Sequence, residues 1–241
     1  MNMDKILEMT TGQIVVRDYR ASEIFDNHNI DYYNKGHDKL ADACQARRIN
    51  PEKIINELEK LKKVSGDNEV DYNTWTLDAL IEEIEFKQRR FFVDRTAEIK
   101  NFLNNLISIQ RKNDSELSDV INIFNHFSSE TSVHLMKERL ILFPYVRKLF
   151  DAKKMKSKYM PLNYFTLDFA VAAMKDEHNN EANYINQISE ITNIYMPFGR
   201  DEGYRIAFML FKSLKKELIR TIHLENNILF PKAIELEKEL S

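Results

Sequence analysis

Glycine and proline are scarce in this chain of 241 residues, which contains five of each. Ordinary usage would be roughly 7% glycine and 5% proline, so few turns and long helices are expected. The five glycines, Gly12, Gly36, Gly66, Gly199 and Gly203, fit neither glycine-rich pattern that binds dinucleotides or nucleotide phosphates. This excludes the usual nucleotide-binding folds.

Cysteine and long apolar runs are also in short supply. The single Cys44 excludes an intrachain disulfide and an all-thiolate metal site, so any metal would be held by histidines and carboxylates. The longest apolar runs, at 140–143 and 206–211, are far shorter than the roughly 20 residues of a membrane helix. The N-terminus also lacks the apolar segment of a secretion signal. We therefore expect a soluble, cytoplasmic protein with no membrane partner.

The chain has no large excess of charge of either sign. Lys and Arg together number 35 and Asp and Glu 38, which gives a net charge of −3. Charges of both signs spread along the chain are typical of a solvated helical surface and not of a face that binds polyanions. Nucleic acid is therefore not expected as a partner.

One polar stretch, residues 64–74 (VSGDNEVDYNT), lacks helical periodicity and predicts a linker. It separates a small helical N-terminal domain, residues 1–63, from a second domain, residues 75–241. Asn50 followed by Pro51 is typical of the start of a helix in the first domain. In the second domain, Thr76 is the expected N-cap of the first long helix.

Four long stripes of apolar residues at helical spacing follow Thr76. The first is about thirty residues long, and the others cover residues 115–150, 161–195 and 201–240. The segments between them, 111–114, 151–160 and 196–200, are short. The sequence thus predicts an all-α fold in which the small domain precedes an antiparallel four-helix bundle.

Two segments of the bundle domain read alike, Glu138–Pro144 (ERLILFP) and Glu225–Pro231 (ENNILFP). Each places a glutamate six residues before a proline. Residues four apart share a helix face, and the residue four before each glutamate is His134 in the first copy and Thr221 in the second. The first copy therefore offers a histidine and a carboxylate side by side.

The polar spacing extends along the second helix. His126, Glu130, His134 and Glu138 recur every four residues, and the apolar Leu142 continues the interval. This register predicts that the polar residues face the core. Because a buried carboxylate needs a partner, a metal ion held between facing helices is one solution.

The other helices offer further candidates. His178 lies beside the apolar stripe of the third helix, and Gln88 interrupts the apolar face of the first, where its carbonyl could reach a metal. His223 lies about 200° around its helix from Glu225 and is expected to stay outside the site. Spacing alone leaves open whether each histidine is a ligand or an ordinary core or surface residue.

With these motifs in view, the whole chain resembles the repair-of-iron-centres family. Its members are hemerythrin-like di-iron proteins that restore iron–sulfur clusters after nitrosative or oxidative damage. The matching stretches are residues 11–20 (TGQIVVRDYR), 30–31 (ID), 40–44 (LADAC), 49–52 (INPE), 134–138 (HLMKE), 142–144 (LFP), 177–178 (EH) and 222–231 (IHLENNILFP).

The resemblance implies that His134, Glu138, His178 and Glu225 bind iron. Two of the family's iron-binding histidines are replaced, by Gln88 on the first helix and by Thr221 on the fourth. Since each iron would lose one imidazole, the resemblance implies an altered, weakened metal site.

Other residues bear on the same site. Glu130 and Glu177 match acidic residues near the family's iron site, where they could orient histidines or guide ions. Glu181, three residues after His178, could enter a rebuilt site. Where the family's N-terminal domain has a Cys-Cys-Gly-Gly turn, this chain reads YNKG at 33–36, so thiol chemistry is not available there.

We therefore expect an iron-binding stress-response protein whose clients are damaged iron–sulfur proteins, not a conventional enzyme for a small substrate. A homodimer is compatible with the sequence. The alternative is a metal-depleted paralogue that works as a protein-binding or regulatory module, which the lost cysteines and histidines favour. A sensor of oxygen or nitric oxide would need an open position on an intact iron, and the two replacements disfavour it.

Overall fold

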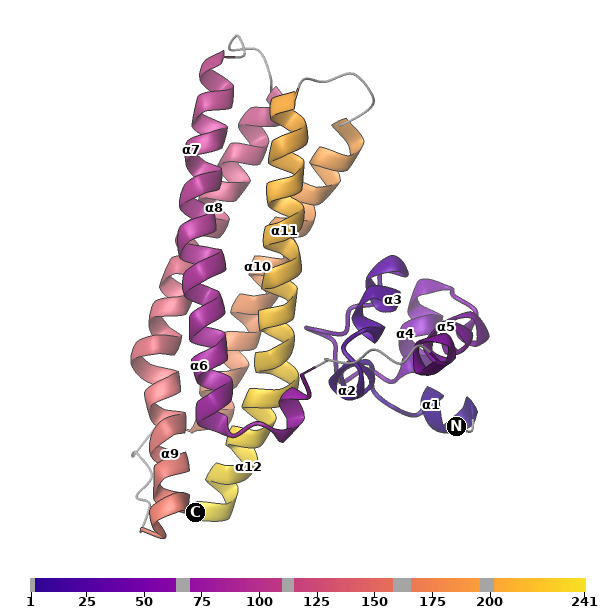
Figure 1. Cartoon of the computed structure of the whole chain (residues 1–241), viewed down its shortest axis with the longest axis vertical. Coiled ribbons are helices and arrows are strands. Elements are labelled where there is room, and N and C mark those ends of the chain that lie inside the picture. The colour runs from indigo at the N-terminus through magenta and orange to yellow at the C-terminus, as the bar shows by residue number, and fades with distance from the viewer. Residues whose placement is uncertain (1–2, 64–69, 110–114, 158–165, 196–201) are drawn as a thin grey trace.

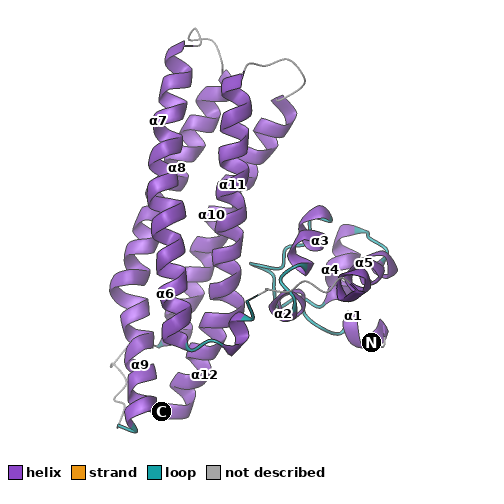
Figure 2. Cartoon of the chain, viewed as in Figure 1, coloured by secondary structure: helices purple, strands orange, loops and turns teal. Residues whose placement is uncertain are grey.

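The structure is a computed structural model that describes residues 3–63, 70–109, 115–157, 166–195 and 202–241. Secondary structure in these ranges is helical, apart from an isolated bridge between Thr10 and Lys39. Figure 1 shows a group of short helices beside a long bundle, and Figure 2 shows helices joined by loops. The predicted all-α class, with a small helical N-terminal part, is confirmed.

The N-terminal part contains α1 (Met3–Leu7), α2 (Thr11–Arg17), α3 (Ala21–Asn27), α4 (Leu40–Arg47) and α5 (Pro51–Lys63). A capping box starts α2. The Thr10 hydroxyl accepts a hydrogen bond from the backbone N–H of Gln13, and the side-chain Oε1 of Gln13 accepts one from the backbone N–H of Thr10. Pro51 opens α5 as predicted, and the Asn50 side chain accepts a hydrogen bond from the Glu52 N–H.

Four helical rods form the described part of the bundle (Figure 1). A short 3₁₀ turn, η1 (Tyr72–Thr74), precedes them, and the Thr76 hydroxyl caps the first rod as predicted. None of the described helices is both long and apolar enough to cross a bilayer. In chain order the rods are α6 (Leu77–Lys87), η2 (Gln88–Val93) and α7 (Asp94–Ile109); α8 (Ser115–Lys137), η3 (Glu138–Leu142) and α9 (Phe143–Met155); α10 (Leu167–Tyr195); and α11 (Glu202–Leu224), η4 (Glu225–Leu229) and α12 (Phe230–Leu240).

Within the described ranges, three rods contain a π-helical segment (η2, η3 and η4), which the 3.6-residue periodicity did not predict. In η3 the Phe143 N–H donates to the Glu138 carbonyl, and in η4 the Phe230 N–H donates to the Glu225 carbonyl. A proline follows each phenylalanine. Because proline has no N–H and its ring crowds the carbonyl four residues before it, the regular ladder cannot continue there. The wider five-residue bond absorbs the mismatch.

Two predicted boundaries are wrong. The third helix, predicted to begin at residue 161, begins at Leu167, because Thr166 is not helical. Residues 151–155, expected in a connection, continue α9 to Met155. The helix ends because Lys156 adopts the left-handed conformation, with φ of 50°, and its N–H donates back to the helix. The predicted connections 111–114 and 196–200, residues 161–165 at the predicted start of the third helix, and residues 64–69 of the predicted linker lie outside the described residues.

Two apolar clusters fill the molecule, and a polar layer separates them. One cluster lies toward the end of the bundle where α7 ends and α8 begins, and it includes Phe124, Phe127 and Phe211. The other surrounds the opposite end and includes Leu80, Phe143 and Phe230. The residues between them on each rod are buried but polar: Gln88, His134, Glu138, His178, Glu181, Thr221 and Glu225.

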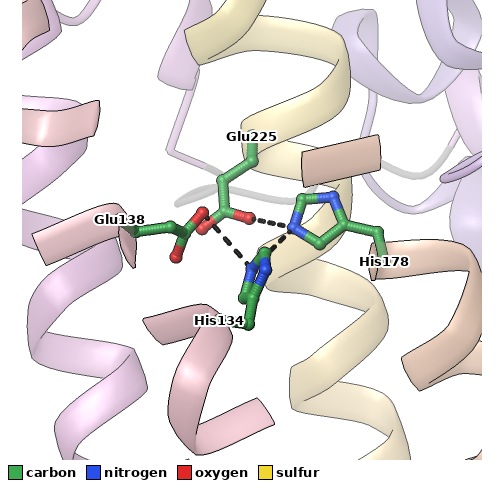
Figure 3. A group of neighbouring side chains, drawn as sticks. All are labelled: His134, Glu138, His178 and Glu225. Atoms are coloured by element: carbon green, nitrogen blue, oxygen red, sulfur yellow. Dashed lines mark hydrogen bonds and ion pairs between the residues drawn. The ribbon is translucent and has the colours of Figure 1, made fainter. Parts of the chain in front are cut away.

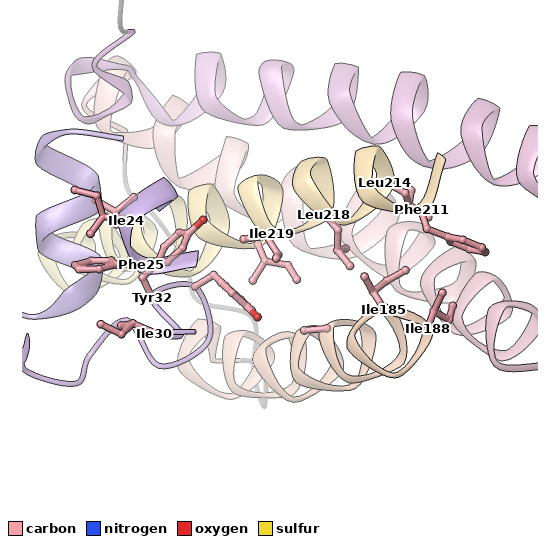
Figure 4. Close-up of a cluster of buried hydrophobic side chains, with 14 of the residues drawn as sticks. Ile24, Phe25, Ile30, Tyr32, Ile185, Ile188, Phe211, Leu214, Leu218 and Ile219 are labelled. Carbon is pink, nitrogen blue, oxygen red and sulfur yellow. The ribbon is translucent and has the colours of Figure 1, made fainter. Parts of the chain in front are cut away.

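The N-terminal helices share the first of these clusters with the bundle. Figure 4 shows Phe25, Ile30 and Tyr32 of the N-terminal part next to Ile219 of α11, in a cluster that continues to Ile185 of α10. Tyr32 and Phe25 are fully buried, and exposing either side chain to water would cost about 1.5–3 kcal/mol of free energy. The two parts of the chain therefore pack through one continuous core.

Phe124 provides a test of the apolar cluster that also includes Phe127 and Phe211. It is fully buried and packs against Phe127 and edge-on against Phe211, with ring centroids 5.9 and 5.3 Å away. We expect Phe124→Ala to lower the free energy of unfolding by about 3–5 kcal/mol in urea titrations, because it leaves a cavity. The matched variant Phe169→Ala, at a ring that is 76% exposed, should change it by less than about 0.5 kcal/mol. Equal effects would contradict this assignment of the core.

Candidate metal centre

The polar layer contains a compact group of two histidines and two glutamates (Figure 3). His134 lies near the end of α8, Glu138 opens η3, His178 lies in α10 and Glu225 opens η4. All four side chains are buried, and one ligand atom from each lies within 4.8 Å of the others. The residues expected to bind metal are thus brought together from three rods.

The π segments help to place these side chains. Gln88, Glu138 and Glu225 are each the first residue of such a segment, so three facing rods change their helical repeat at the same level. A π turn re-aims the side chains that flank it, and such turns are frequent at functional sites. Each copy of the sequence repeat, from its glutamate to its proline, therefore contains one π-helical segment.

Four atoms face a common point. The Nε2 atoms of His134 and His178 lie 3.1 Å apart, and Glu225 Oε2 lies 2.9 Å from His178 Nε2. Glu138 Oε1 lies 3.4 Å from His134 Nε2 and accepts no hydrogen bond from the described residues. A fully buried carboxylate oxygen without a donor is costly, and a cation at this point would satisfy it. The donor set of two imidazoles and two carboxylates suits a divalent transition metal.

Gln88 faces the site, as its register predicted, but its amide nitrogen and not its carbonyl does the bonding. Its Nε2 donates to Glu138 Oε2 at 2.6 Å and to Glu225 Oε1 at 3.1 Å. The amide thereby ties together the two carboxylate oxygens that point away from the histidines. It occupies the first-rod side of the group.

Thr221 is buried on α11, but its hydroxyl donates to the Glu217 carbonyl of its own helix at 2.9 Å. The hydroxyl proton is therefore used within the helix itself. Within the described part of the chain, no hydrogen bond joins Thr221 to the four clustered residues. The fourth rod therefore offers no replacement for the missing histidine in this arrangement.

Glu177 holds His134 from outside the group. Its Oε2 lies 2.9 Å from His134 Nδ1, and its Oε1 accepts from Lys137 Nζ at 2.5 Å. Burial tends to raise the pKa of Glu177, but the hydrogen bonds from Lys137 and His134 lower it below its usual range. An ionised Glu177 fixes the His134 ring with Nδ1 protonated, which directs Nε2 into the site.

The outer half of the predicted polar ladder does not reach the site. Glu130 and His126 are exposed, and Glu130 accepts a hydrogen bond from the Tyr184 hydroxyl at 3.0 Å instead of orienting a histidine. The reason is geometric: four residues advance an α-helix by about 400°, so each step turns the side chain about 40° further around the axis. Only His134 and Glu138 remain inside.

Glu181 is buried one turn from His178 but lies outside the compact group. Its Oε1 has no hydrogen-bond partner among the residues that the structure describes. Burial raises its pKa, although His134 and His178 pull in the opposite direction. It lies near the group, on the helix face that the sequence had predicted.

The four clustered residues differ in their protonation. Burial lowers the pKa of His134, but Glu138 and then Glu181 outweigh it, so the pKa lies well above the usual value. Burial lowers the pKa of His178, and the neighbouring His134 adds to this. Burial and Glu138 raise the pKa of Glu225 well above its usual value. The raised pKa values of His134 and Glu225 favour their protonated forms, and the lowered pKa of His178 favours its neutral form.

Asn226 is a residue of the site that sequence reasoning missed. Its Oδ1 lies 3.0 Å from His178 Nδ1. The signal was present in the repeat, because η4 carries two consecutive asparagines where η3 carries Arg139 and Leu140. His223, by contrast, stays outside the group as predicted and contacts the rings of Tyr19 and Tyr32.

Comparison with known proteins agrees with this geometry. Residues 92–233 match the family described as hemerythrin HHE cation binding domain. The chain belongs to this hemerythrin family. Residues 7–62 match a second family, ScdA_N, which is described as a domain of unknown function. Cation binding is therefore a property of the family to which the bundle belongs.

Proteins from several bacteria match this chain over most of its length and most of their own. The iron–sulfur cluster repair protein YtfE of Pectobacterium atrosepticum is 23% identical over 231 residues, covering 94% of this chain and 97% of its own. A probable iron–sulfur cluster repair protein of Haemophilus influenzae is 25% identical over 218 residues, covering 89% of this chain and 91% of its own. The expected resemblance to iron-centre repair proteins is confirmed over most of the chain.

Metal binding at this site should be linked to protons. A metal ion needs the lone pair of His134 Nε2 and an ionised Glu225, whereas the raised pKa of each group favours the protonated form that the ion would have to displace. We expect the affinity for Co²⁺, measured by titration calorimetry, to rise about tenfold per pH unit for each displaced proton between pH 6 and 8.

Two buffers with different ionisation enthalpies check this expectation. The binding enthalpy should differ between them by an amount that corresponds to one to two protons released. A binding constant independent of pH and buffer would show that the ion does not displace these protons.

Proposed function

We propose that the chain is an iron-binding stress-response protein that returns iron to iron–sulfur clusters damaged by nitrosative or oxidative stress, and that its altered site holds one ferrous ion. The observation that carries the proposal is the convergence of His134, Glu138, His178 and Glu225 in a buried layer of a hemerythrin bundle. The clients follow from the names of the relatives, which are iron–sulfur cluster repair proteins.

The position of Gln88 supports one ion and not two. Each carboxylate directs one oxygen to the Gln88 amide and the other toward a histidine. The oxygens on the Gln88 side are therefore already satisfied by N–H donors, which repel a second cation. The two histidine Nε2 atoms lie too close together to serve separate ions, and they converge with Glu138 Oε1 and Glu225 Oε2 on one point.

The charges of the donor set fit a dication. Two ionised carboxylates balance the charge of a divalent ion, and two neutral imidazoles add nitrogen donors, so the dry layer would carry no net charge. Ferrous iron bound here would supply an exchangeable, redox-active ion. Glu177 and Lys137, which hold His134 from outside, keep the ring in place with Nδ1 protonated.

Release of the ion would be coupled to the uptake of protons from solvent. When His134 Nε2 and the Glu225 carboxyl take up protons, they can form the close contacts with His178 Nε2 that the structure contains. The cost of an empty site is therefore limited, because Gln88 still donates to both carboxylates. An ion held in this way can be given up, as a donor to damaged clusters requires.

The same hydrogen bonds favour a second candidate. Gln88 and the retained protons satisfy most of the polar layer without metal, as a metal-depleted binding or regulatory module would need. The Oε1 atom of Glu138, which accepts no hydrogen bond from the described residues, argues for the metal-bound function. A cytoplasmic location and a homodimer remain predictions that accompany the proposal.

The metal content decides between these functions. Untagged protein reconstituted anaerobically with ferrous iron should hold one iron per chain by mass spectrometry. Glu138→Gln should lose it, because the variant removes a charge and replaces an anionic oxygen donor. The matched control Glu130→Gln, an exposed glutamate on the same rod, should keep the iron.

Cluster repair is tested with the same three proteins. The loaded protein and the Glu130→Gln control should reactivate an iron–sulfur dehydratase that nitric oxide has inactivated, whereas Glu138→Gln should not. Two irons per chain would contradict the single-ion site, and no iron in any sample would favour the metal-free module.

The replaced histidines can be restored. In the double variant Gln88→His and Thr221→His, the amide that ties the carboxylates is lost and two imidazoles face the layer. We expect the iron content to rise from one toward two per chain, since the oxygens that Gln88 satisfied become free to bind metal. A content that stays at one would show that these two positions do not form a second metal site.

A further inference from the structure

The side chain of Asn226 joins the candidate metal centre to the N-terminal part of the chain. It is 5% exposed and extends from η4, one residue after Glu225. Its Oδ1 lies 3.0 Å from His178 Nδ1, and its Nδ2 donates to the backbone carbonyl of Tyr33 at 3.1 Å. One buried amide therefore connects a metal-facing histidine with the main chain of the loop before α4.

The direction of these bonds follows from the chemistry of each group. A backbone carbonyl only accepts, so the Tyr33 oxygen requires the amide nitrogen of Asn226 on its side. Asn226 then presents its oxygen to His178, and that oxygen also only accepts. His178 Nδ1 must therefore carry a proton, and in the neutral ring this leaves the Nε2 lone pair directed toward Glu225 and His134. This is the tautomer that a metal ligand needs.

Asn227 fixes the same loop beside it. Its Nδ2 donates to the Tyr32 carbonyl at 2.9 Å and lies 2.9 Å from His223 Nδ1, while the Tyr32 ring packs edge-on against His223. Two consecutive carbonyls of the loop are thus held by two consecutive amides of η4. The loop cannot shift without breaking both hydrogen bonds.

Two glycines make this close approach feasible. A Cβ atom at Gly12 would lie 2.7 Å from Asn227 Oδ1, and one at Gly36 would lie 2.6 Å from the Tyr32 carbonyl. Real Cβ atoms essentially never come this close, so either substitution must displace the loop or the Asn227 side chain. These positions can be changed without touching His178 or Asn226.

We propose that the docked N-terminal domain controls the metal centre through Asn226, which acts as a positioning residue: the Tyr33 carbonyl orients the Asn226 amide, and the amide fixes the tautomer and ring orientation of His178. The inference about metal affinity rests on the proposed metal site, whereas the inference about the tautomer does not. Displacement of the loop is then a route by which the N-terminal domain weakens the site and releases the ion.

The metal-free protein provides the first test. In ¹⁵N-histidine-labelled protein, two-bond ¹H–¹⁵N correlations should show His178 protonated at Nδ1 and unprotonated at Nε2. Asn226→Ala should convert this signal to a mixture of tautomers. Gly36→Ala should do the same from a distance, with Gly12→Ala as a second docking variant. Asn180→Ala, an exposed amide on α10, should leave the signal unchanged.

Metal binding provides the second test, with Co²⁺ as the probe. Asn226→Ala and Gly36→Ala should each weaken Co²⁺ binding about 10- to 100-fold, as is typical for loss of the partner behind a ligating histidine. The double variant should bind no more weakly than Asn226→Ala alone, because both changes act through the same bond.

The two readouts separate the hypotheses. A Gly36→Ala protein that is less stable but keeps the Nδ1 tautomer and wild-type Co²⁺ affinity would overturn the control by docking, as would an Asn226→Ala protein with an unchanged His178 signal. Failure of the wild-type protein to bind Co²⁺ or iron would instead refute the proposed metal site, and the tautomer measurement would still decide the role of Asn226.

Discussion

The buried pair of carboxylates, Glu138 and Glu225, is the constraint on which the rest of the structure depends. Two carboxyl groups in a dry bundle core must be neutralised or fully hydrogen-bonded, because unpaired buried charge costs several kcal/mol. Gln88, His134 and His178 surround them for this reason, and apolar clusters close the layer on both sides. Protons or a cation can neutralise this pair of carboxylates.

The fold class could be predicted because it depends on helical periodicity, whereas the four clustered residues were identified as a set through the family resemblance. Four-residue spacing is enough to place His134 and Glu138 on one inner face over one turn. The same spacing failed over longer distances. Glu130 faces the solvent because each step of four residues turns the side chain about 40° further around the helix axis, until the π-helical segment at Glu138 changes the repeat. The direction of the Gln88 amide was not predictable, since it depends on two carboxylates 50 and 137 residues away.

The contact between the N-terminal part and the bundle could not be predicted from the sequence. The polar stretch at 64–74 suggested two separate domains, yet Phe25 and Tyr32 share a core with Ile219 of the bundle. That contact joins residues nearly 200 positions apart, and no periodicity reports it. Gly12 and Gly36 were counted in the composition as scarce turn residues, whereas the structure uses them to let Asn227 approach the backbone of another segment.

The changes relative to the iron-centre repair family fall on both sides of the Asn226 link. The family's Cys-Cys-Gly-Gly turn is replaced by Tyr33-Asn34-Lys35-Gly36, yet the glycine that the docked loop needs is still present and the Tyr33 carbonyl bonds to Asn226. Because a backbone carbonyl is supplied by any residue, loss of the thiols removes chemistry from the loop without removing its hydrogen bond with Asn226. The loop can therefore keep a role in holding the site after losing its own reactive groups.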